Sequence, residues 1–187
     1  QEGESRLDEV ESFLTQQLSS YVYGKDEDEL EEKVGALLKE KSLTLATAES
    51  CTGGLIAHRL TQVSGSSDYF KEGFVVYSND AKINRLQVEP RLFAEFGAVS
   101  EPVAQAMAKG VCRVTGADIG ISVTGIAGPS GGSDLKPLGL TYIAVHDRSG
   151  TYCRKFIFTH DRIKNKERSA QAALNLVRLR LQGKLEN

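Results

Sequence analysis

The stretch that decides the fold is LTLATAESCTGGLIAHRLTQV, residues 43–63. Residues 43–48 carry apolar and β-branched side chains over a length typical of a short strand. Residues 49–54 supply polar and glycine positions for a turn, and residues 55–63 repeat apolar side chains at helical spacing. The apolar face of that helix consists of Leu55, Ile56, Leu60 and Val63. The stretch therefore predicts a strand, a tight turn and a helix, the building unit of an α/β sheet.

Further strands and helices are predicted on both sides of this unit. Strands are expected at residues 74–77 and 118–124, and residues 138–145 and 151–158 should form an antiparallel hairpin. Helices are expected over residues 4–18, 90–96 and 163–181, and around the apolar positions of residues 30–38, 82–86 and 103–114. This order predicts the α/β class, as a three-layer α/β/α sandwich with a mixed, mostly parallel sheet.

The chain divides into two parts. Residues 1–24 are predicted to be an N-terminal helical segment or linker from a longer protein, with apolar positions at Leu7, Val10, Phe13, Leu14 and Leu18. Residues 25–187 are predicted to form the main domain, a size typical of one hydrophobic core. The first residue is Gln1 rather than Met, which favours a processed or excised piece of something longer.

Charge and cysteine content narrow the class of protein. The 187 residues include 23 basic and 25 acidic side chains, for a formal net charge of −2. This balance disfavours a nucleic-acid binder that relies on phosphate neutralisation, as do 13 aromatic residues without a tryptophan. No apolar run is long enough to span a bilayer, and the three cysteines form no C-x-x-C pair. We therefore expect a soluble protein of the reducing cytoplasm, without membrane contact.

Ser50 is the candidate nucleophile. A hydroxyl on a sharp turn between a strand and a helix is exposed, and the N–H groups near Thr52, Gly53 and Gly54 could stabilise an oxyanion. The alternative is that Ser50 or Thr52 only caps the helix, which position alone slightly favours. Cys51 is a rival nucleophile, but without a placed histidine partner it is better explained as a small packing residue.

Lys82 is the candidate base. It lies one turn into a helix that begins just after Tyr77, at the same expected edge of the sheet as Ser50. A lysine desolvated beside a serine can lose its proton near neutral pH, and Tyr77 could relay one. Taken singly, Lys82 is as well explained as a solvated helix lysine and Tyr77 as a strand aromatic. Nothing in the sequence connects any of the three histidines, His58, His146 and His160, to Ser50.

A glycine-rich loop, residues 125–132, follows the strand at 118–124. Four of its eight residues are glycine, but their spacing matches neither the nucleoside-triphosphate loop nor G-x-G-x-x-G. Because open α/β sheets bind ligands at the carboxyl ends of strands, we expect the loop to face a ligand. A plain structural turn remains the alternative. No histidine pair or cysteine cluster has metal-ligand spacing, so we expect no metal and no cofactor.

Four ordered blocks of sequence resemble one family. They are AESCTGG at residues 48–54, GFVVYSNDAK at 73–82, GAVSEPV at 97–103 and GIAGP at 125–129, the last followed by Gly131 and Gly132. Together they resemble the C-terminal domain of the competence/damage-inducible CinA proteins, from about residue 25 to about 182. That family is similar to the nicotinamide mononucleotide deamidases.

The resemblance implies a function and a set of site residues. It implies an amidohydrolase in pyridine-nucleotide recycling that converts nicotinamide mononucleotide to nicotinic acid mononucleotide and ammonia. The family's nucleophile falls on Ser50 and its partners on Tyr77 and Lys82, which are also the candidates found from the residues. Substrate binding would fall on Thr52, Gly53, Gly54, Thr124, Gly125, Gly128 and Arg162. The alternative is a catalytically silent nucleotide-binding regulatory module of a two-domain protein.

The same resemblance implies partners and shows one departure. The expected partners are the small mononucleotide, a second copy in a homodimer, and an N-terminal domain joined covalently in the full-length protein. The family usually has Gly-Asp-Arg before its last helix and an arginine four residues later, whereas this chain has His160-Asp161-Arg162 and Lys166. Lysine keeps the charge but loses the bidentate grip, which weakens Arg162 and Lys166 as phosphate-binding residues.

Overall fold

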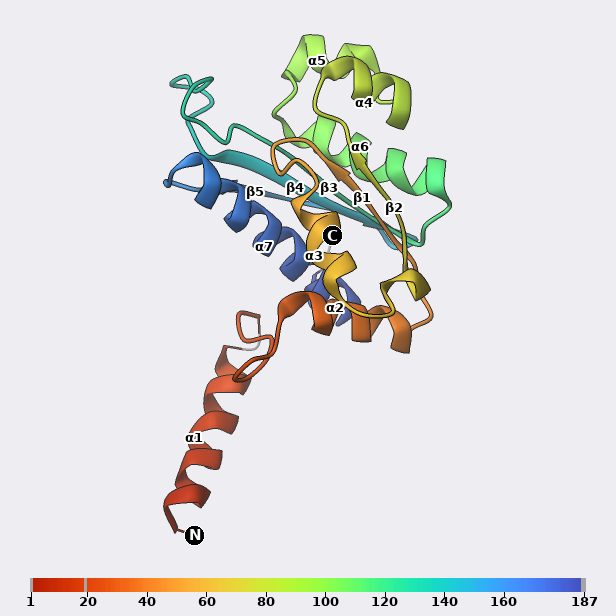
Figure 1. The fold of residues 1–187 in the computed structure, drawn as a ribbon. Helices are drawn as coiled ribbons and strands as arrows, with labels where there is room; N and C mark the ends of the chain where they lie inside the picture. The colour runs from red at the N-terminus through yellow and green to blue at the C-terminus, as the bar shows by residue number, and fades with distance from the viewer. Residues whose placement is uncertain (1, 19, 186–187) are drawn as a thin grey trace.

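A five-stranded sheet forms the middle layer of the computed structural model, which describes residues 2–18 and 20–185 (Figure 1). The strands lie in the order β2-β1-β3-β4-β5. β1 pairs in parallel with β2 and β3, whereas the β3–β4 and β4–β5 pairs are antiparallel, so four of the strands point the same way. Their bounds are β1 Leu45–Glu49, β2 Phe70–Val75, β3 Ile119–Gly125, β4 Leu140–Asp147 and β5 Gly150–Ile157.

Helices cover both faces of this sheet. One face is covered by α2 (Leu30–Glu40), α3 (Leu55–Gln62) and α7 (Arg162–Leu181). The other is covered by α4 (Asn79–Leu86), α5 (Pro90–Phe96) and α6 (Glu101–Thr115). Successive side chains of a strand point to opposite faces, so Leu45 packs in the first core and Ala46 in the second. The predicted α/β sandwich with its mixed sheet is confirmed.

Some predicted details differ from the structure. β2 begins four residues and ends two residues earlier than the predicted strand at 74–77, because an edge strand with exposed polar side chains lacks the alternation that marks a buried strand. Between α3 and β2 the chain also forms a short 3₁₀ helix, Ser66–Asp68. Val114, predicted to belong to the buried stripe of α6, is exposed near the end of that helix. Ser100 is the residue before α6, and its hydroxyl donates to Gly97 O at 2.8 Å rather than accepting from the first amides of that helix.

The first helix, α1 (Glu2–Gln17), extends away from the sandwich (Figure 1). Its predicted apolar side chains and Leu18 are exposed: Leu7, Val10, Phe13, Leu14 and Leu18. The chain rejoins the domain after α1, where the buried Arg178 of α7 donates hydrogen bonds to Ser20 O and Val22 O. Residues 20–22 are therefore attached to α7, whereas the apolar side chains of α1 remain exposed and belong to none of the buried clusters of the described residues.

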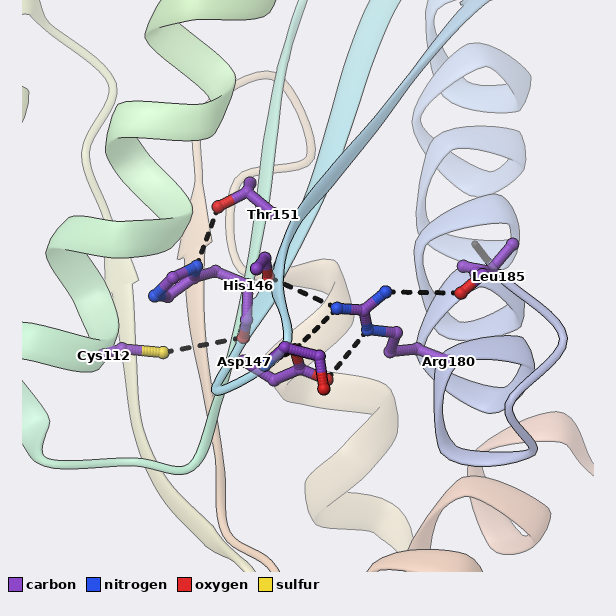
Figure 2. Close-up of polar contacts among 8 residues, drawn as sticks. Cys112, His146, Asp147, Thr151, Arg180 and Leu185 are labelled. Carbon is purple, nitrogen blue, oxygen red and sulfur yellow. Dashed lines mark hydrogen bonds and ion pairs between the residues drawn. The ribbon is translucent and has the colours of Figure 1, made fainter. Parts of the chain in front are cut away.

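The end of the sheet that lies farthest from Ser50 is held by an ion pair (Figure 2). Arg180 of α7 donates to both carboxylate oxygens of Asp147, at 2.8 and 2.7 Å, and so ties the β4–β5 turn to the helix. The guanidinium keeps the pKa of Asp147 below its ordinary value. Bidentate, largely buried pairs of this kind fix geometry as well as adding stability. Within the described residues, no helix is long and apolar enough to cross a membrane.

Candidate active site

Ser50 lies on the turn between β1 and α3, as the sequence predicts. Its N–H donates to Val123 O at 3.0 Å, which continues the pairing of β1 with β3 by one residue. Gly53 and Gly54 follow with positive φ angles of 64° and 95°, a conformation that costs other residues energy. The turn closes tightly because those two glycines can adopt it, and Ser50 reaches the carboxyl edge of the sheet.

Two of the amides expected to hold an oxyanion are already engaged. Gly53 N–H donates to Ser50 O at 3.2 Å, and Gly54 N–H donates to a carboxylate oxygen of Glu49 at 3.0 Å. Within the described residues, the amides of Cys51 and Thr52 donate to no other residue. The amides left to stabilise an oxyanion beside Ser50 are therefore those of Cys51 and Thr52, not those of Gly53 and Gly54.

Lys82 of α4 reaches Ser50. Its Nζ lies 3.2 Å from Ser50 Oγ, 2.8 Å from Val76 O and 3.0 Å from Tyr77 O. Ser78 sets the start of α4, since its Oγ accepts from Ala81 N at 3.0 Å. Lys82 is only 1% exposed, and within the described residues no carboxylate pairs with it. Burial lowers the pKa of Lys82 from 10.5 to about 8, because the charged form is poorly solvated there.

A small cavity of about 180 Å³ surrounds the pair. Six predicted site residues line it: Ser50, Tyr77, Lys82, Thr124, Gly125 and Arg162. Cys51 lines it as well. Three small apolar residues that the sequence analysis did not single out also line it: Ala98, Val99 and Ala127. Thr124 Oγ1 donates to Ala98 O at 2.9 Å, which holds the α5–α6 connection against the end of β3. Among the residues that the structure describes, no acidic side chain lines the cavity.

Tyr77 lines this cavity, but its hydroxyl lies beside Arg162 and not at the Ser50–Lys82 pair. Its side chain is 63% exposed, and its hydroxyl lies 3.5 Å from Arg162 Nη2. In the described part of the chain, that hydroxyl makes no hydrogen bond to Ser50 or to Lys82. The contribution of Tyr77 to the pair is its backbone carbonyl, which accepts from Lys82 Nζ.

Comparison with known proteins identifies the family. A family model described as CinA C-terminal domain matches residues 27–181. The chain belongs to the CinA C-terminal domain family. The resemblance carried by the four sequence blocks is thus confirmed. Two of those blocks contain Ser50 and Lys82, so the pair that meets in the cavity comes from segments by which the family was identified.

Relatives of this CinA domain are longer proteins. A CinA-like protein of Chloroherpeton thalassium is 51% identical over 174 residues, which cover 91% of this chain and 41% of that protein. A CinA-like protein of Citrifermentans bemidjiense is 47% identical over 172 residues, which cover 92% of this chain and 42% of that protein. The chain therefore spans about two fifths of the length of these curated relatives.

Solved structures of the family share the fold of this CinA domain. The competence/damage inducible protein CihA from Agrobacterium tumefaciens has a TM-score of 0.80 and 37% identity, over 86% of this chain and 98% of that chain. A CinA superfamily protein from Klebsiella pneumoniae has a TM-score of 0.80 and 34% identity, over 82% of this chain and 96% of that chain.

The glycine-rich loop of the CinA domain is held by residues that sequence reasoning missed. Asn165 of α7 donates to Ala127 O at 3.0 Å, and Lys136 Nζ donates to Phe96 O and Val99 O at 2.6 and 2.9 Å. Arg162 Nη1 donates to Gly128 O at 2.7 Å, so Gly128 contacts the site through its carbonyl although it does not line the cavity. These anchors lie far from the loop or beyond its end in sequence, where no local pattern could reveal them.

Thr52 and Cys51 follow Ser50 on the turn, but only Cys51 lines the cavity. Thr52, Gly53 and Gly54 do not line the cavity, and the buried Thr52 hydroxyl has no hydrogen-bond partner in the described part of the chain. Cys51 does line it, but burial raises the pKa of its thiol to about 12. A thiol with that pKa carries almost no thiolate near pH 7, and the hydroxyl within hydrogen-bond distance of Lys82 Nζ is that of Ser50.

A larger hollow of about 850 Å³ lies at the other end of the sheet, between the C-terminal ends of α2 and α7 and the β4–β5 turn. Asp147 and Arg180, which line this hollow, form an ion pair with each other. The buried contact between Ser50 and Lys82 lies in the smaller cavity, so we place the candidate chemistry there. The greater volume of the other hollow does not by itself indicate a reactive site.

Proposed function

We propose that this CinA domain is an amidohydrolase that converts nicotinamide mononucleotide to nicotinic acid mononucleotide and ammonia. The observation that carries the proposal is the 3.2 Å contact between Lys82 Nζ and Ser50 Oγ inside a cavity without acidic side chains. A buried serine and lysine in contact, where no described carboxylate pairs with the lysine, are suited to nucleophilic attack on an acyl group.

The three neighbours of Lys82 Nζ favour its action as a base. A neutral amine has two N–H donors and one lone pair. The carbonyl oxygens of Val76 and Tyr77 can only accept, so they take the two N–H groups. The lone pair is then directed at Ser50 Oγ, which must donate its own proton to Lys82. Deprotonated Lys82 is therefore held in the orientation that a general base requires.

The reaction then proceeds through an acyl-enzyme. Ser50 Oγ attacks the carboxamide carbon while its proton passes to Lys82, and the Cys51 and Thr52 amides stabilise the oxyanion. Lys82 returns the proton to the leaving nitrogen, the C–N bond breaks and ammonia departs. Water next attacks the ester at Ser50, with Lys82 accepting its proton, and the release of the carboxylic acid restores the serine.

The remainder of the substrate would lie outside the cavity. A volume of about 180 Å³ suits a single ring, with small side chains such as Ala98 and Ala127 against its faces. Arg162 stands at the cavity, and a methyl group added at Gly53 would lie 3.6 Å from Lys166 Nζ, so Lys166 faces the same turn. These two cations, one helical turn apart on α7, are suited to an anionic phosphate.

The test is ammonia release from nicotinamide mononucleotide by the purified chain. We expect release from the wild-type protein, loss of at least about 100-fold in kcat for Ser50→Ala, and no change for Ser64→Ala, an exposed serine beyond α3. Wild-type turnover by Ser50→Ala would refute the mechanism. Tight binding of the mononucleotide without ammonia would instead support the alternative, a nucleotide-binding regulatory module.

A further inference from the structure

Glu49, the residue before Ser50, has a buried carboxylate whose oxygens are both engaged. Oε2 accepts from Gly54 N at 3.0 Å and from Ile56 N at 3.1 Å. Oε1 accepts from Ala57 N at 2.8 Å and lies 3.5 Å from Thr47 Oγ1. Glu49 is 0% exposed, and in the described part of the chain no cationic side chain pairs with it. Its charge is therefore stabilised by the first amides of α3 and by the positive end of that helix.

This carboxylate fixes the turn that carries Ser50. Neighbouring side chains of an extended segment point to opposite sides, so Glu49 points toward α3 while Ser50 points toward Lys82. Glu49 is thereby joined to three amides on the far side of the turn, and Ser50 lies between these anchors and β1. A small movement of those anchors would move Ser50 Oγ relative to Lys82 Nζ.

The same carboxylate takes the place that a ligand's anion could occupy. The N-terminus of a helix that follows a strand attracts phosphate and carboxylate groups, because its amides are unpaired and its dipole is positive. Here the protein supplies the anion itself. The start of α7 is filled in the same way, since Asp161 accepts from the amides of Ile163 and Lys164. An anionic group beside α3 would meet a filled site and a like charge.

We infer that Glu49 is a positioning residue that holds the Ser50 turn in its reactive shape and excludes anions from the start of α3. The part of this inference that concerns substrate orientation rests on the proposed function. The uncharged carboxamide then enters beside Ser50, and the phosphate of the substrate is directed to the side chains of Arg162 and Lys166. Glu49 acts through the turn and does not touch the reacting atoms.

The test compares Glu49→Gln with a matched control, Glu31→Gln. Glutamine keeps the size of Glu49 but turns an NH₂ group toward amides that need an acceptor. Glu31 is another buried carboxylate of the same core face, paired with Arg59 at 2.6 Å. We expect Glu49→Gln to lower kcat on the order of 100-fold with KM within about threefold, and Glu31→Gln to change neither. Wild-type kcat in Glu49→Gln, or an equal loss in both variants, would overturn the inference.

A second measurement does not depend on turnover. Inorganic phosphate should raise the melting temperature of Glu49→Gln, and of Glu49→Ala if it folds, more than that of the wild-type protein or Glu31→Gln. An equal shift in all of these proteins would show that the carboxylate excludes no anion. If the wild-type protein releases no ammonia, the proposed function fails, and the phosphate shifts alone then decide whether Glu49 fills the α3 terminus.

Discussion

At the scale of single residues, the site depends on Lys82, whose amine is shielded from water by the surrounding protein. Lys82 is as buried as the largest core side chains, yet its amine meets only two carbonyl oxygens and a hydroxyl. Carbonyls solvate an amine less well than water or a carboxylate would, and this is why its pKa falls. The same surroundings that destabilise the charged form make the neutral amine available as a base.

The rate should therefore depend on pH through Lys82. The base must be neutral, so kcat/KM should rise with pH and level off above a midpoint near 8, the value to which burial lowers the pKa of Lys82. Lys82→Met should lose at least about 100-fold in kcat/KM. Initial rates from pH 6 to 10 measure this. A profile that is flat across pH 8 would rule out Lys82 as the titrating base.

The stability of the fold should change over the same range. The folded pKa of Lys82 is about 8 and the ordinary value is 10.5, so between these values the unfolded chain binds more protons. The cost of burying the charge is complete below pH 8 and disappears as pH rises toward 10.5. The free energy of unfolding should rise by about 2 kcal/mol between pH 7 and 9.5 relative to Lys82→Met. Urea unfolding of both proteins measures this, and parallel pH curves would contradict it.

At the scale of elements, the cavity is closed by loops anchored to distant helices. The glycine-rich loop is held by Asn165 and Arg162 of α7, and Lys136 fastens it to the segment between α5 and α6. That segment contributes Ala98 and Val99 to the cavity. The walls around Ser50 thus depend on hydrogen bonds to backbone carbonyls as well as on the hydrophobic core, to which Cys51 and Ala127 belong.

Removal of the Lys136 anchor should loosen the cavity without removing the reacting groups. Lys136→Met loses the hydrogen bonds to Phe96 O and Val99 O, so we expect KM for nicotinamide mononucleotide to rise about fivefold to tenfold with kcat within about threefold. Lys155→Met, on the exposed side of β5, is the control and should match the wild-type protein. Steady-state kinetics distinguish the two, and an unchanged KM in Lys136→Met would contradict this role.

Sequence reasoning succeeds for local geometry and fails for long-range contacts. The strand–turn–helix unit around Ser50 and the capped helix of Lys82 follow from local spacing, which is why both candidates could be named. Asn165 and Lys136 could not, because their partners are carbonyl oxygens that any residue type supplies. Glu49 was treated as part of the turn, since only the structure shows three amides converging on its carboxylate.

At the scale of the whole molecule, the sheet brings the site together from three segments. β1 delivers Ser50, the chain after β2 leads to Lys82, and β3 ends at Thr124 and the glycine-rich loop. The strand order β2-β1-β3 places these three carboxyl ends side by side, in agreement with the general position of ligands in open α/β sheets. The order of strands could not be deduced from the sequence, which specifies pairing only for the hairpin.

The first helix should be dispensable for this arrangement. The apolar side chains of α1 are exposed, and Arg178 donates hydrogen bonds to Ser20 O and Val22 O, which lie after α1 in the chain. We expect a chain that lacks residues 1–17 to keep its melting temperature within about 2 °C and its rate of ammonia release unchanged. Calorimetry and the ammonia assay measure both. A fall of about 5 °C or more would show that α1 stabilises the domain.

Detection of the acyl-enzyme tests most directly whether Ser50 is the nucleophile. The protein is mixed with nicotinamide mononucleotide, and the reaction is quenched with acid during turnover. The protein is then digested, and the mass of the peptide that contains Ser50 is measured by mass spectrometry. We expect a mass increase equal to the acyl group on that peptide in the wild-type protein, and none in Ser50→Ala. Ammonia release at the wild-type rate by Ser50→Ala, with no adduct on the peptide of the wild-type protein, would contradict this expectation.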